Sequence, residues 1–279
     1  MRRDNRPSTS DHTPGAESPL AHVMAERDRA ALSMVAEAVR HGNLRLAYQP
    51  VVQANRPDRP AFYEGLIRIL DETGRTIPAR DFISAVETTE LGRQIDCAAL
   101  DMGLRALARH PGLRLSINMS ARSIGYPAWL RTLRRALDRN DTLGERLILE
   151  ITESSAMLVP ELVTTFMGDL QRRGITFALD DFGSGFTSFR YLRDFYFDLV
   201  KIDGQFIRGI HADPDNQVLT RALVAIARQF DMFTVAEQVE SEPDAQWLIA
   251  AGVDCLQGYL YGAPTVAPPW QKDDLRDTG

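Results

Sequence analysis

Eight short apolar runs, each ending on or near a polar residue, restrict how this chain of 279 residues can fold more than any other feature. In chain order they are LRLAYQ, FYEGLIRI, LRLSINMS, RLILEITE, ITFALDD, FDLVKID, FTVAEQVE and VDCLQG. Continuous apolar runs of this length, separated by longer helical segments, are typical of strands buried in a parallel sheet. Eight such strands with helices between them favour a closed (β/α) barrel over an open sheet.

Stretches with the apolar spacing of amphipathic helices precede and separate most of these runs. The first covers residues 21–41 and ends at Gly42, a residue type that commonly terminates helices. Residues 82–109 are numerous enough for two helices. Single helices are predicted at residues 128–137, 161–173, 216–230 and 244–251.

The connection between the first two strands is unusual. The segment QANRPDRP between Val52 and Ala61 contains two prolines and is too short for a crossover helix. Parallel neighbours need a crossover of about a dozen residues or more, so these two strands should be antiparallel. We therefore predict an α/β fold, a TIM-like (β/α)8 barrel in which the first strand pair is antiparallel.

The N-terminal residues differ from the rest of the chain. Residues 1–20 are rich in Ser, Pro, Asp and Arg, which predicts a disordered tail before a single domain at residues 21–279, with the barrel core at about residues 43–264. The tail lacks the apolar stretch of a secretory signal, and no run of about 18 apolar residues predicts a membrane span. Cys97 and Cys255 form no CxxC pattern, so we expect a cytoplasmic protein.

The charge balance and the histidines limit the possible partners. The chain has 38 acidic and 32 basic residues, a formal net charge of −6, which argues against binding to DNA or RNA backbones. Its five histidines are scattered and show no metal-ligand spacing. Any metal site must therefore be built from oxygen ligands. Lysine is rare, because the chain has only Lys201 and Lys272.

Polar side chains stand near the ends of six predicted strands. They are Asn118, Glu150, the pair Asp180 and Asp181, Lys201, Glu237 and Gln257, and Glu64 interrupts an earlier apolar run. The carboxyl ends of the strands form the mouth of a (β/α) barrel, so we expect these side chains to converge there. A charged group in a buried strand is costly unless it is paired or binds a metal.

Several carboxylates and an amide, without histidine or cysteine, favour hard cations such as Mg²⁺, Mn²⁺ or Ca²⁺. The carboxylates exceed what one ion needs, so we predict a two-metal site for phosphoryl displacement, with one member of the Asp180–Asp181 pair bridging both ions. Taken singly, such carboxylates are usually helix caps or solvated rim charges, Lys201 can reach solvent, and the segment DFGSG is an ordinary glycine-rich loop. Their joint occurrence at matching strand ends favours the metal site.

The motifs resemble those of EAL-domain cyclic-di-GMP phosphodiesterases over about residues 21–264. The family signature is similar to Glu64-Gly65-Leu66-Ile67-Arg68, with Gly65 where Ala is usual. The successive blocks YQP, LSINMSARS, ILEITES, LDDFGSGFTS, FDLVKID, TVAEQVE and LQGYLYGAP also resemble those of the family.

This resemblance implies that the chain hydrolyses one phosphodiester bond of cyclic di-GMP to linear pGpG with two Mg²⁺ or Mn²⁺ ions, as a homodimer. It implies one ion held by Glu64, Asn118, Glu150 and Asp180, and a second held by Asp180, Asp181 and Glu237. It implies catalytic roles for Lys201, Glu237 and Glu240, and substrate binding by Gln49, Leu66, Arg68 and Gln257, with Arg68 and Gln257 near a phosphate. Glu153 is expected to support the loop that follows Asp181.

Four departures from the family pattern stand out, and one of them, DFGSGF in place of the more usual DFGTGY, is conservative. Gly65 removes a methyl group and is expected to loosen its strand, Gln238 puts a bulkier side chain beside the second metal, and the ending YGAP lies beyond the ligands. Two other functions compete with the phosphodiesterase. A catalytically silent cyclic-di-GMP receptor or interaction module typically lacks metal ligands that this chain keeps. Another Mg²⁺-dependent barrel enzyme, of the enolase type, does not account for the ordered blocks.

Overall fold

The computed structural model describes residues 19–71, 73–184 and 192–270. The predicted tail at residues 1–20 lies outside the described residues except for its last two, which begin helix α1 (Pro19–His41). None of the helices in the described ranges is long and apolar enough to cross a membrane.

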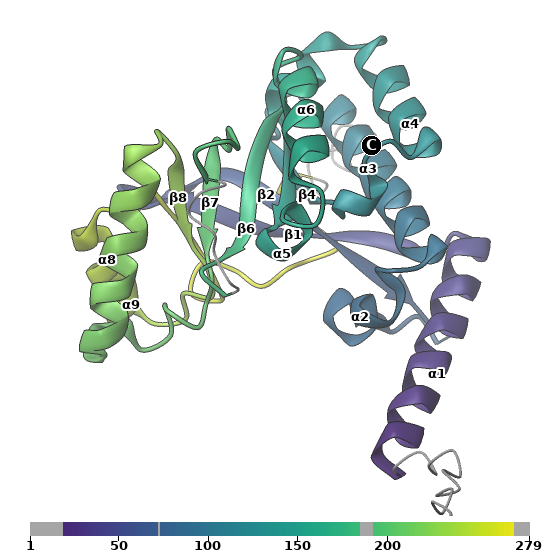
Figure 1. The fold of residues 1–279 in the computed structure, drawn as a ribbon, viewed down its shortest axis with the longest axis horizontal. Coiled ribbons are helices and arrows are strands. Elements are labelled where there is room, and N and C mark those ends of the chain that lie inside the picture. Colours follow the sequence, from purple (N-terminus) through teal and green to yellow (C-terminus); the bar gives the residue numbers. More distant parts are fainter. Residues whose placement is uncertain (1–18, 72, 185–191, 271–279) are drawn as a thin grey trace, which may run out of the picture.

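All eight predicted runs form strands of one closed barrel (Figure 1). The strands are β1 (Leu44–Gln53), β2 (Arg56–Leu70), β4 (Leu115–Asn118), β5 (Leu147–Thr152), β6 (Thr176–Phe182), β7 (Leu199–Ile202), β8 (Phe233–Ala236) and β9 (Cys255–Gln257). Their order around the barrel is β1-β9-β8-β7-β6-β5-β4-β2, and β2 pairs back with β1. An additional short strand, β3 (Thr76–Pro78), pairs with the outer end of β2.

The predicted antiparallel pairing of β1 with β2 is confirmed. The structure differs in the connection, because the chain turns at Ala54 and Asn55 and then continues as strand. Pro57 and Pro60 therefore lie within β2, beside a register irregularity at Val52. Proline is tolerated at bulges and edges because its missing N–H breaks no regular ladder bond there.

The helices cover the outside of the barrel. They are α2 (Ile83–Val86), α3 (Glu90–Arg109), α4 (Pro127–Leu137), α5 (Glu153–Ala156), α6 (Pro160–Gln171), α8 (Pro214–Gln229) and α9 (Glu242–Ala251). In Figure 1, α3, α4 and α6 lie on one side and α8 and α9 on the other. The one-turn helix α5 was not predicted; the Thr152 hydroxyl caps it by accepting a hydrogen bond from the Ser155 N–H.

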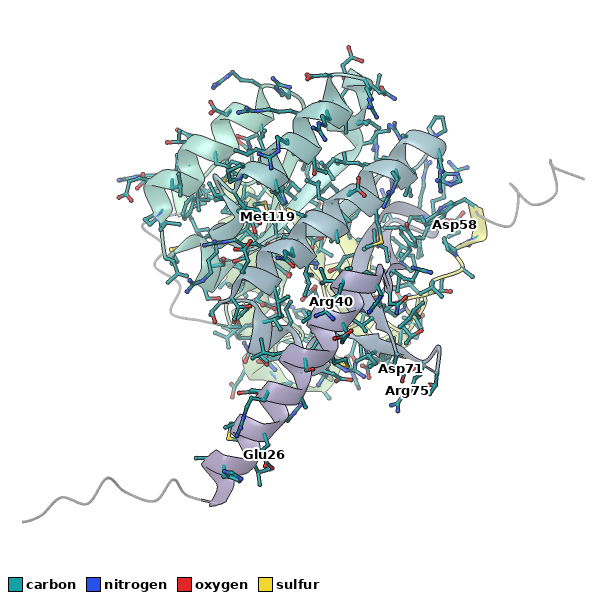
Figure 2. All side chains as sticks on the ribbon, turned by 90° about the vertical axis from the view of Figure 1, so that its right-hand side faces the viewer. Glu26, Arg40, Asp58, Asp71, Arg75 and Met119 are labelled. Atoms are coloured by element: carbon teal, nitrogen blue, oxygen red, sulfur yellow. The ribbon has the colours of Figure 1, made fainter. Side chains whose placement is uncertain are left out.

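Only the second half of helix α1 packs on the barrel. Its residues Ala31, Val35 and Ala38 are buried, whereas the first half is almost entirely exposed. Figure 2 shows this arrangement, with Glu26 on the projecting part and Arg40 near the barrel.

Gly65 does not loosen its strand in the way expected from the missing methyl group. A Cβ at this position would lie 2.7 Å from Ile117 Cδ1, and a Cβ at Gly103 would lie 2.8 Å from the same atom. The Ile117 side chain therefore fills the space that both glycines leave, and close packing is kept.

Candidate active site

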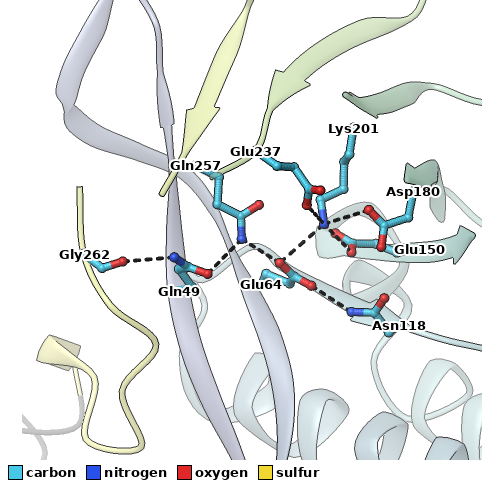
Figure 3. Close-up of polar contacts among 9 residues, drawn as sticks. All are labelled: Gln49, Glu64, Asn118, Glu150, Asp180, Lys201, Glu237, Gln257 and Gly262. Atoms are coloured by element: carbon cyan, nitrogen blue, oxygen red, sulfur yellow. Dashed lines mark hydrogen bonds and ion pairs between the residues drawn. The ribbon is translucent and has the colours of Figure 1, made fainter. Parts of the chain in front are cut away.

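Five charged side chains meet at the mouth of the barrel, and Lys201 lies at their centre (Figure 3). Its Nζ atom lies 2.8 Å from Glu237 Oε1, 2.9 Å from Glu150 Oε2, 3.1 Å from Asp180 Oδ1 and 3.4 Å from Glu64 Oε2. The lysine is 1% exposed. Four carboxylates thus surround one buried ammonium group.

The barrel topology produces this cluster. Glu64, Glu150, Asp180 and Lys201 belong to β2, β5, β6 and β7, and Glu237 directly follows β8. The parallel register places Asn118 of β4 opposite Glu150, and Asp180 opposite Thr152. Side chains far apart in the sequence therefore reach one end of the barrel, as expected for the carboxyl ends of parallel strands.

Electrostatic effects differ among these groups. Burial lowers the pKa of Lys201, but the four carboxylates outweigh burial and hold the pKa well above its usual value. Burial, with the charge of Glu64, raises the pKa of Glu150 well above its usual value. Burial also raises the pKa of Glu237 to about 8. For Glu64 burial is outweighed by Lys201 and by two amide hydrogen bonds, so its pKa is lowered.

Two oxygen atoms of the cluster have fewer partners than buried polar atoms normally have. Glu150 Oε1 is buried without a hydrogen bond among the described residues, and Asp180 Oδ1 has only its ion pair with Lys201. Asp180, Asp181 and Glu237 each offer an oxygen within 4.8 Å of the others. These residues therefore fit a divalent cation, because such ions take several carboxylate oxygens and compensate their charge.

Asp181 has an uncommon backbone conformation, with φ of 57°. Aspartate tolerates this left-handed region better than most residues. Burial and the neighbouring Asp180 raise the pKa of Asp181 to about 6. The strand end thus turns sharply enough for two consecutive carboxylates to belong to one acidic group.

A chain of side-chain amides extends from the cluster towards the C-terminal part of the domain (Figure 3). Asn118 Nδ2 donates to Glu64 Oε1 at 2.8 Å, and Gln257 Nε2 donates to Glu64 Oε2 at 2.6 Å. Gln257 Nε2 also donates to Gln49 Oε1 at 3.2 Å, and Gln49 Nε2 donates to the carbonyl of Gly262 at 3.1 Å. Both glutamines are buried.

The cluster opens into a pocket of about 420 Å³. Gln49, Leu66, Arg68, Glu240 and Gln257 line it, as do most of the clustered charges. Glu240 is an exposed wall residue outside the ion-pair cluster. Arg68 is half-buried and donates to the carbonyl of Ile67.

Among the pocket-wall residues that sequence reasoning missed, Arg80, Arg208 and Tyr259 have polar side chains that can contact a ligand. Arginine is abundant in this chain and the two arginines follow none of the predicted strand ends, so no local pattern distinguishes them. The pocket wall also includes Gln238, whose φ is 55°. Its side chain accepts a hydrogen bond from Arg208 and packs where a side chain at Gly204 would otherwise lie.

Glu153 is the first residue of α5 and directly follows β5. It is buried, and its Oε2 accepts a hydrogen bond from the backbone N–H of Gly183 at 3.1 Å. This contact joins α5 to the beginning of the segment that follows β6. The segment that Glu153 is expected to support continues into residues 185–191, which lie outside the described residues.

The sequence is similar to those of known signalling proteins. An EAL domain family model matches residues 32–264. The chain is 30% identical to the cyclic di-GMP phosphodiesterase PdeB of Shewanella oneidensis, over 82% of this chain and 27% of PdeB. It is 32% identical to the bifunctional diguanylate cyclase/cyclic di-GMP phosphodiesterase MucR of Pseudomonas aeruginosa, over 83% of this chain and 34% of MucR. It thus spans about a third of these relatives.

The fold is similar to solved structures over nearly their full length. The PaMucR phosphodiesterase in complex with c-di-GMP superposes with a TM-score of 0.76 and 31% identity, over 87% of this chain and 99% of that structure. The FimX EAL domain of Pseudomonas aeruginosa bound to c-di-GMP superposes with a TM-score of 0.77 and 25% identity, over 85% and 97%. With the family match covering most of the chain, this protein belongs to the EAL domain family.

Proposed function

We propose that this domain hydrolyses one phosphodiester bond of cyclic di-GMP, giving linear pGpG and lowering the level of a bacterial second messenger. The observation that carries the proposal is the buried group of four carboxylates around Lys201, with oxygens that have no hydrogen-bond partner in the described chain. Relatives named as cyclic di-GMP phosphodiesterases and structures holding c-di-GMP support the choice of substrate.

The proposed cofactor is a pair of Mg²⁺ or Mn²⁺ ions. Glu64, Asn118, Glu150 and Asp180 would hold one ion, and Asp180, Asp181 and Glu237 the other. Such ions supply an activated water and positive charge for the attacking and leaving oxygens of a phosphoryl displacement. The unpaired Glu150 Oε1, the Asp180 Oδ1 whose single partner among the described residues is Lys201, and the acidic group of three support this assignment.

The proposed roles of the other residues follow from their positions. Lys201 would hold and orient the attacking water, because its ammonium group is the one cation of the described residues that forms ion pairs with the clustered carboxylates. Glu237 would take part at the same place, and Glu240 would contribute from the pocket wall. Arg68 would contact a phosphate and Leu66 would pack against a guanine, while Gln49 and Gln257 complete that side of the binding pocket.

Three further parts of the proposal concern regulation and environment. We propose that Glu153 holds the segment after β6 in place through its bond to Gly183. The family resemblance supports a homodimer, which sedimentation can measure. Both cysteines are free, in keeping with a reducing cytoplasm.

The experiment is incubation of the purified chain with cyclic di-GMP and Mn²⁺, with pGpG followed by chromatography. Asp180→Asn should abolish product formation, whereas Asp58→Asn, at an exposed position of β2 shown in Figure 2, should leave it unchanged. Nucleotide that binds but stays intact with either metal would support the receptor alternative instead. Absence of binding would overturn both functions.

A further inference from the structure

Gln257 lies in the pocket wall with both of its amide hydrogens already engaged. One hydrogen is donated to Glu64 Oε2 at 2.6 Å, and the other to Gln49 Oε1 at 3.2 Å. Its carbonyl oxygen, Oε1, is buried without a hydrogen-bond partner among the described residues. In Figure 3 this oxygen lies on the side of the amide away from Gln49. The residue is 4% exposed, so bulk water does not satisfy the oxygen.

The orientation of both amides follows from the chemistry of their outer partners. The carbonyl of Gly262 can only accept, so Gln49 must turn its NH₂ group towards it and its oxygen towards Gln257. The carboxylate of Glu64 also accepts, so Gln257 must turn its NH₂ group towards Glu64 and Gln49. Exchanging oxygen and nitrogen in either side chain would place acceptors against acceptors.

The Gly262 end of this chain of hydrogen bonds is fixed by contacts of its segment with β1. The segment that contains Gly262 crosses β1, where Tyr48 and Thr265 exchange two backbone hydrogen bonds of 2.8 and 3.1 Å. Gly262 has a φ of 155° and lies so close to Pro50 that a Cβ would be 3.0 Å from Pro50 Cγ. The ending YGAP, which by sequence lies beyond the ligands, thus contacts the second glutamine of the site.

We propose that Gln49 is a positioning residue, through which the Gly262 carbonyl fixes Gln257 as a hydrogen-bond acceptor for the bound nucleotide. Gln257 then accepts a hydrogen from a guanine N–H or a ribose hydroxyl, and does not contact a phosphate oxygen, because it has no hydrogen left to donate. This inference rests on the proposed function for the identity of the nucleotide. In this proposal Gln49 orients the Gln257 side chain and does not itself contact the nucleotide.

A double-mutant cycle tests the coupling. The dissociation constant of cyclic di-GMP is measured by calorimetry in EDTA, so that the readout does not depend on turnover. We expect Gln257→Met and Gln49→Met each to weaken binding about tenfold, the size of one lost hydrogen bond. In the Gln257→Met background, Gln49→Met should change binding by less than about twofold. Effects that multiply to about a hundredfold would instead mean that Gln49 contacts the nucleotide, and would overturn the proposal.

Two controls separate positioning from folding. Gln246→Met changes an exposed glutamine of α9 and should leave binding and the thermal midpoint unchanged. A Gln49→Met variant that loses thermal stability but binds cyclic di-GMP like the wild type would show a merely structural role, and would also overturn the proposal.

The donor on the nucleotide is identified with analogues that lack the 2′-hydroxyl, the guanine amino group or the guanine N1 hydrogen. For the analogue without the contacted donor, wild type and Gln257→Met should bind about equally. If the tenfold difference persists for all three, Gln257 takes no hydrogen from the nucleotide and the assignment fails.

A ligand-free measurement keeps the two proposals distinguishable. In nuclear magnetic resonance spectra of the free protein, the side-chain amide hydrogens of Gln257 should exchange slowly, and Gln49→Met should accelerate their exchange. Protected Gln257 hydrogens in a protein that fails to bind cyclic di-GMP would support the chain of bonds and overturn the proposed function alone. Unprotected hydrogens in a protein that binds the nucleotide would overturn the positioning role alone.

Discussion

The two ends of the barrel interior bury opposite kinds of side chain, apolar at one end and charged at the other. At the floor, where the strands begin, Val51, Phe62, Ile148, Ala178, Leu199 and Val235 form a separate apolar cluster of buried side chains. At the mouth, where the strands end, Lys201 and four carboxylates occupy the corresponding space. The floor gains stability from burial of apolar surface. The mouth holds ionised groups whose desolvation is costly.

The floor also contains a cavity, of about 830 Å³, which is larger than the pocket at the mouth. Its half-buried charges are engaged with the backbone. Arg146 donates to the carbonyls of Leu107, His110 and Leu113, and Asp254 accepts from the N–H of Thr234. At the mouth, in contrast, buried oxygens of Glu150 and Gln257 have no hydrogen-bond partner within the described ranges. Unsatisfied polar atoms, more than volume, therefore distinguish the candidate site.

The largest expected effect comes from removing the central cation. Lys201→Met leaves four carboxylates without their shared partner, so the free energy of unfolding without metal should fall by about 3 to 5 kcal/mol. Turnover should be lost, and Mn²⁺ should raise the thermal midpoint more in the variant than in the wild type, because added cations compensate the negative charge that Lys201 no longer neutralises. Calorimetry with and without Mn²⁺ measures this; equal shifts would contradict the charge argument.

Removing one carboxylate of the cluster should lower turnover without lowering the free energy of unfolding. Glu150→Gln should lower turnover by about a thousandfold, or about 4 kcal/mol of transition-state stabilisation. Without metal its unfolding free energy should stay equal or increase, since burial and the charge of Glu64 already disfavour the ionised carboxylate. Glu145→Gln, exposed near the floor, is the matched control. A clear loss of stability in Glu150→Gln would show that the carboxylates at the mouth stabilise the fold, as the apolar side chains at the floor do.

At the floor, we expect a mutation to lower stability without changing turnover. Phe62→Ala removes a buried ring from the apolar cluster and should cost about 3 to 5 kcal/mol of unfolding free energy. The turnover of the fraction that remains folded should equal that of the wild type, because Phe62 lies at the other end of the barrel. Urea unfolding and rate measurements on the same sample test this. A lowered turnover per folded molecule would break the distinction between the two ends.

A smaller, pH-dependent effect concerns Asp96, a carboxylate of α3 that lies outside the cluster. Burial raises its pKa to about 6, although it accepts hydrogen bonds from Ser120 N and Ser123 Oγ. The folded protein therefore keeps a proton that the unfolded chain loses near pH 4, so this group's contribution to stability falls as pH rises from about 4 to 6. The Asp96→Asn variant lacks this pH-dependent loss, so its free energy of unfolding should exceed that of the wild type by about 1 to 2 kcal/mol between pH 4.5 and 7.

Urea unfolding of Asp96→Asn and wild type at several pH values measures the difference. The clustered carboxylates titrate in both proteins, so their contributions cancel in this comparison. If the two stability curves run parallel over this range, Asp96 is ionised in the folded protein and its burial has been offset by the serine hydrogen bonds.

Much of the fold could be read from local patterns. The eight strands appear because continuous apolar runs are stable only inside a sheet covered on both faces. The antiparallel first pair follows from chain length, since no crossover fits between β1 and β2. The sequence places the two prolines in the connection between these strands, whereas they lie within β2, because whether proline breaks a strand depends on the ladder bonds at its position, which only the paired strands define.

The sequence by itself determined which chemical groups reach the barrel mouth, because alternation along a strand and its end position decide where a side chain emerges. Tertiary structure alone decided how those groups meet. The central place of Lys201 depends on the curvature and register of the closed sheet. The contact of Gln49 with the Gly262 carbonyl, 213 residues away, depends on a segment folding back across β1. Hydrogen-bond direction is a property of such pairs, so no single residue encodes it.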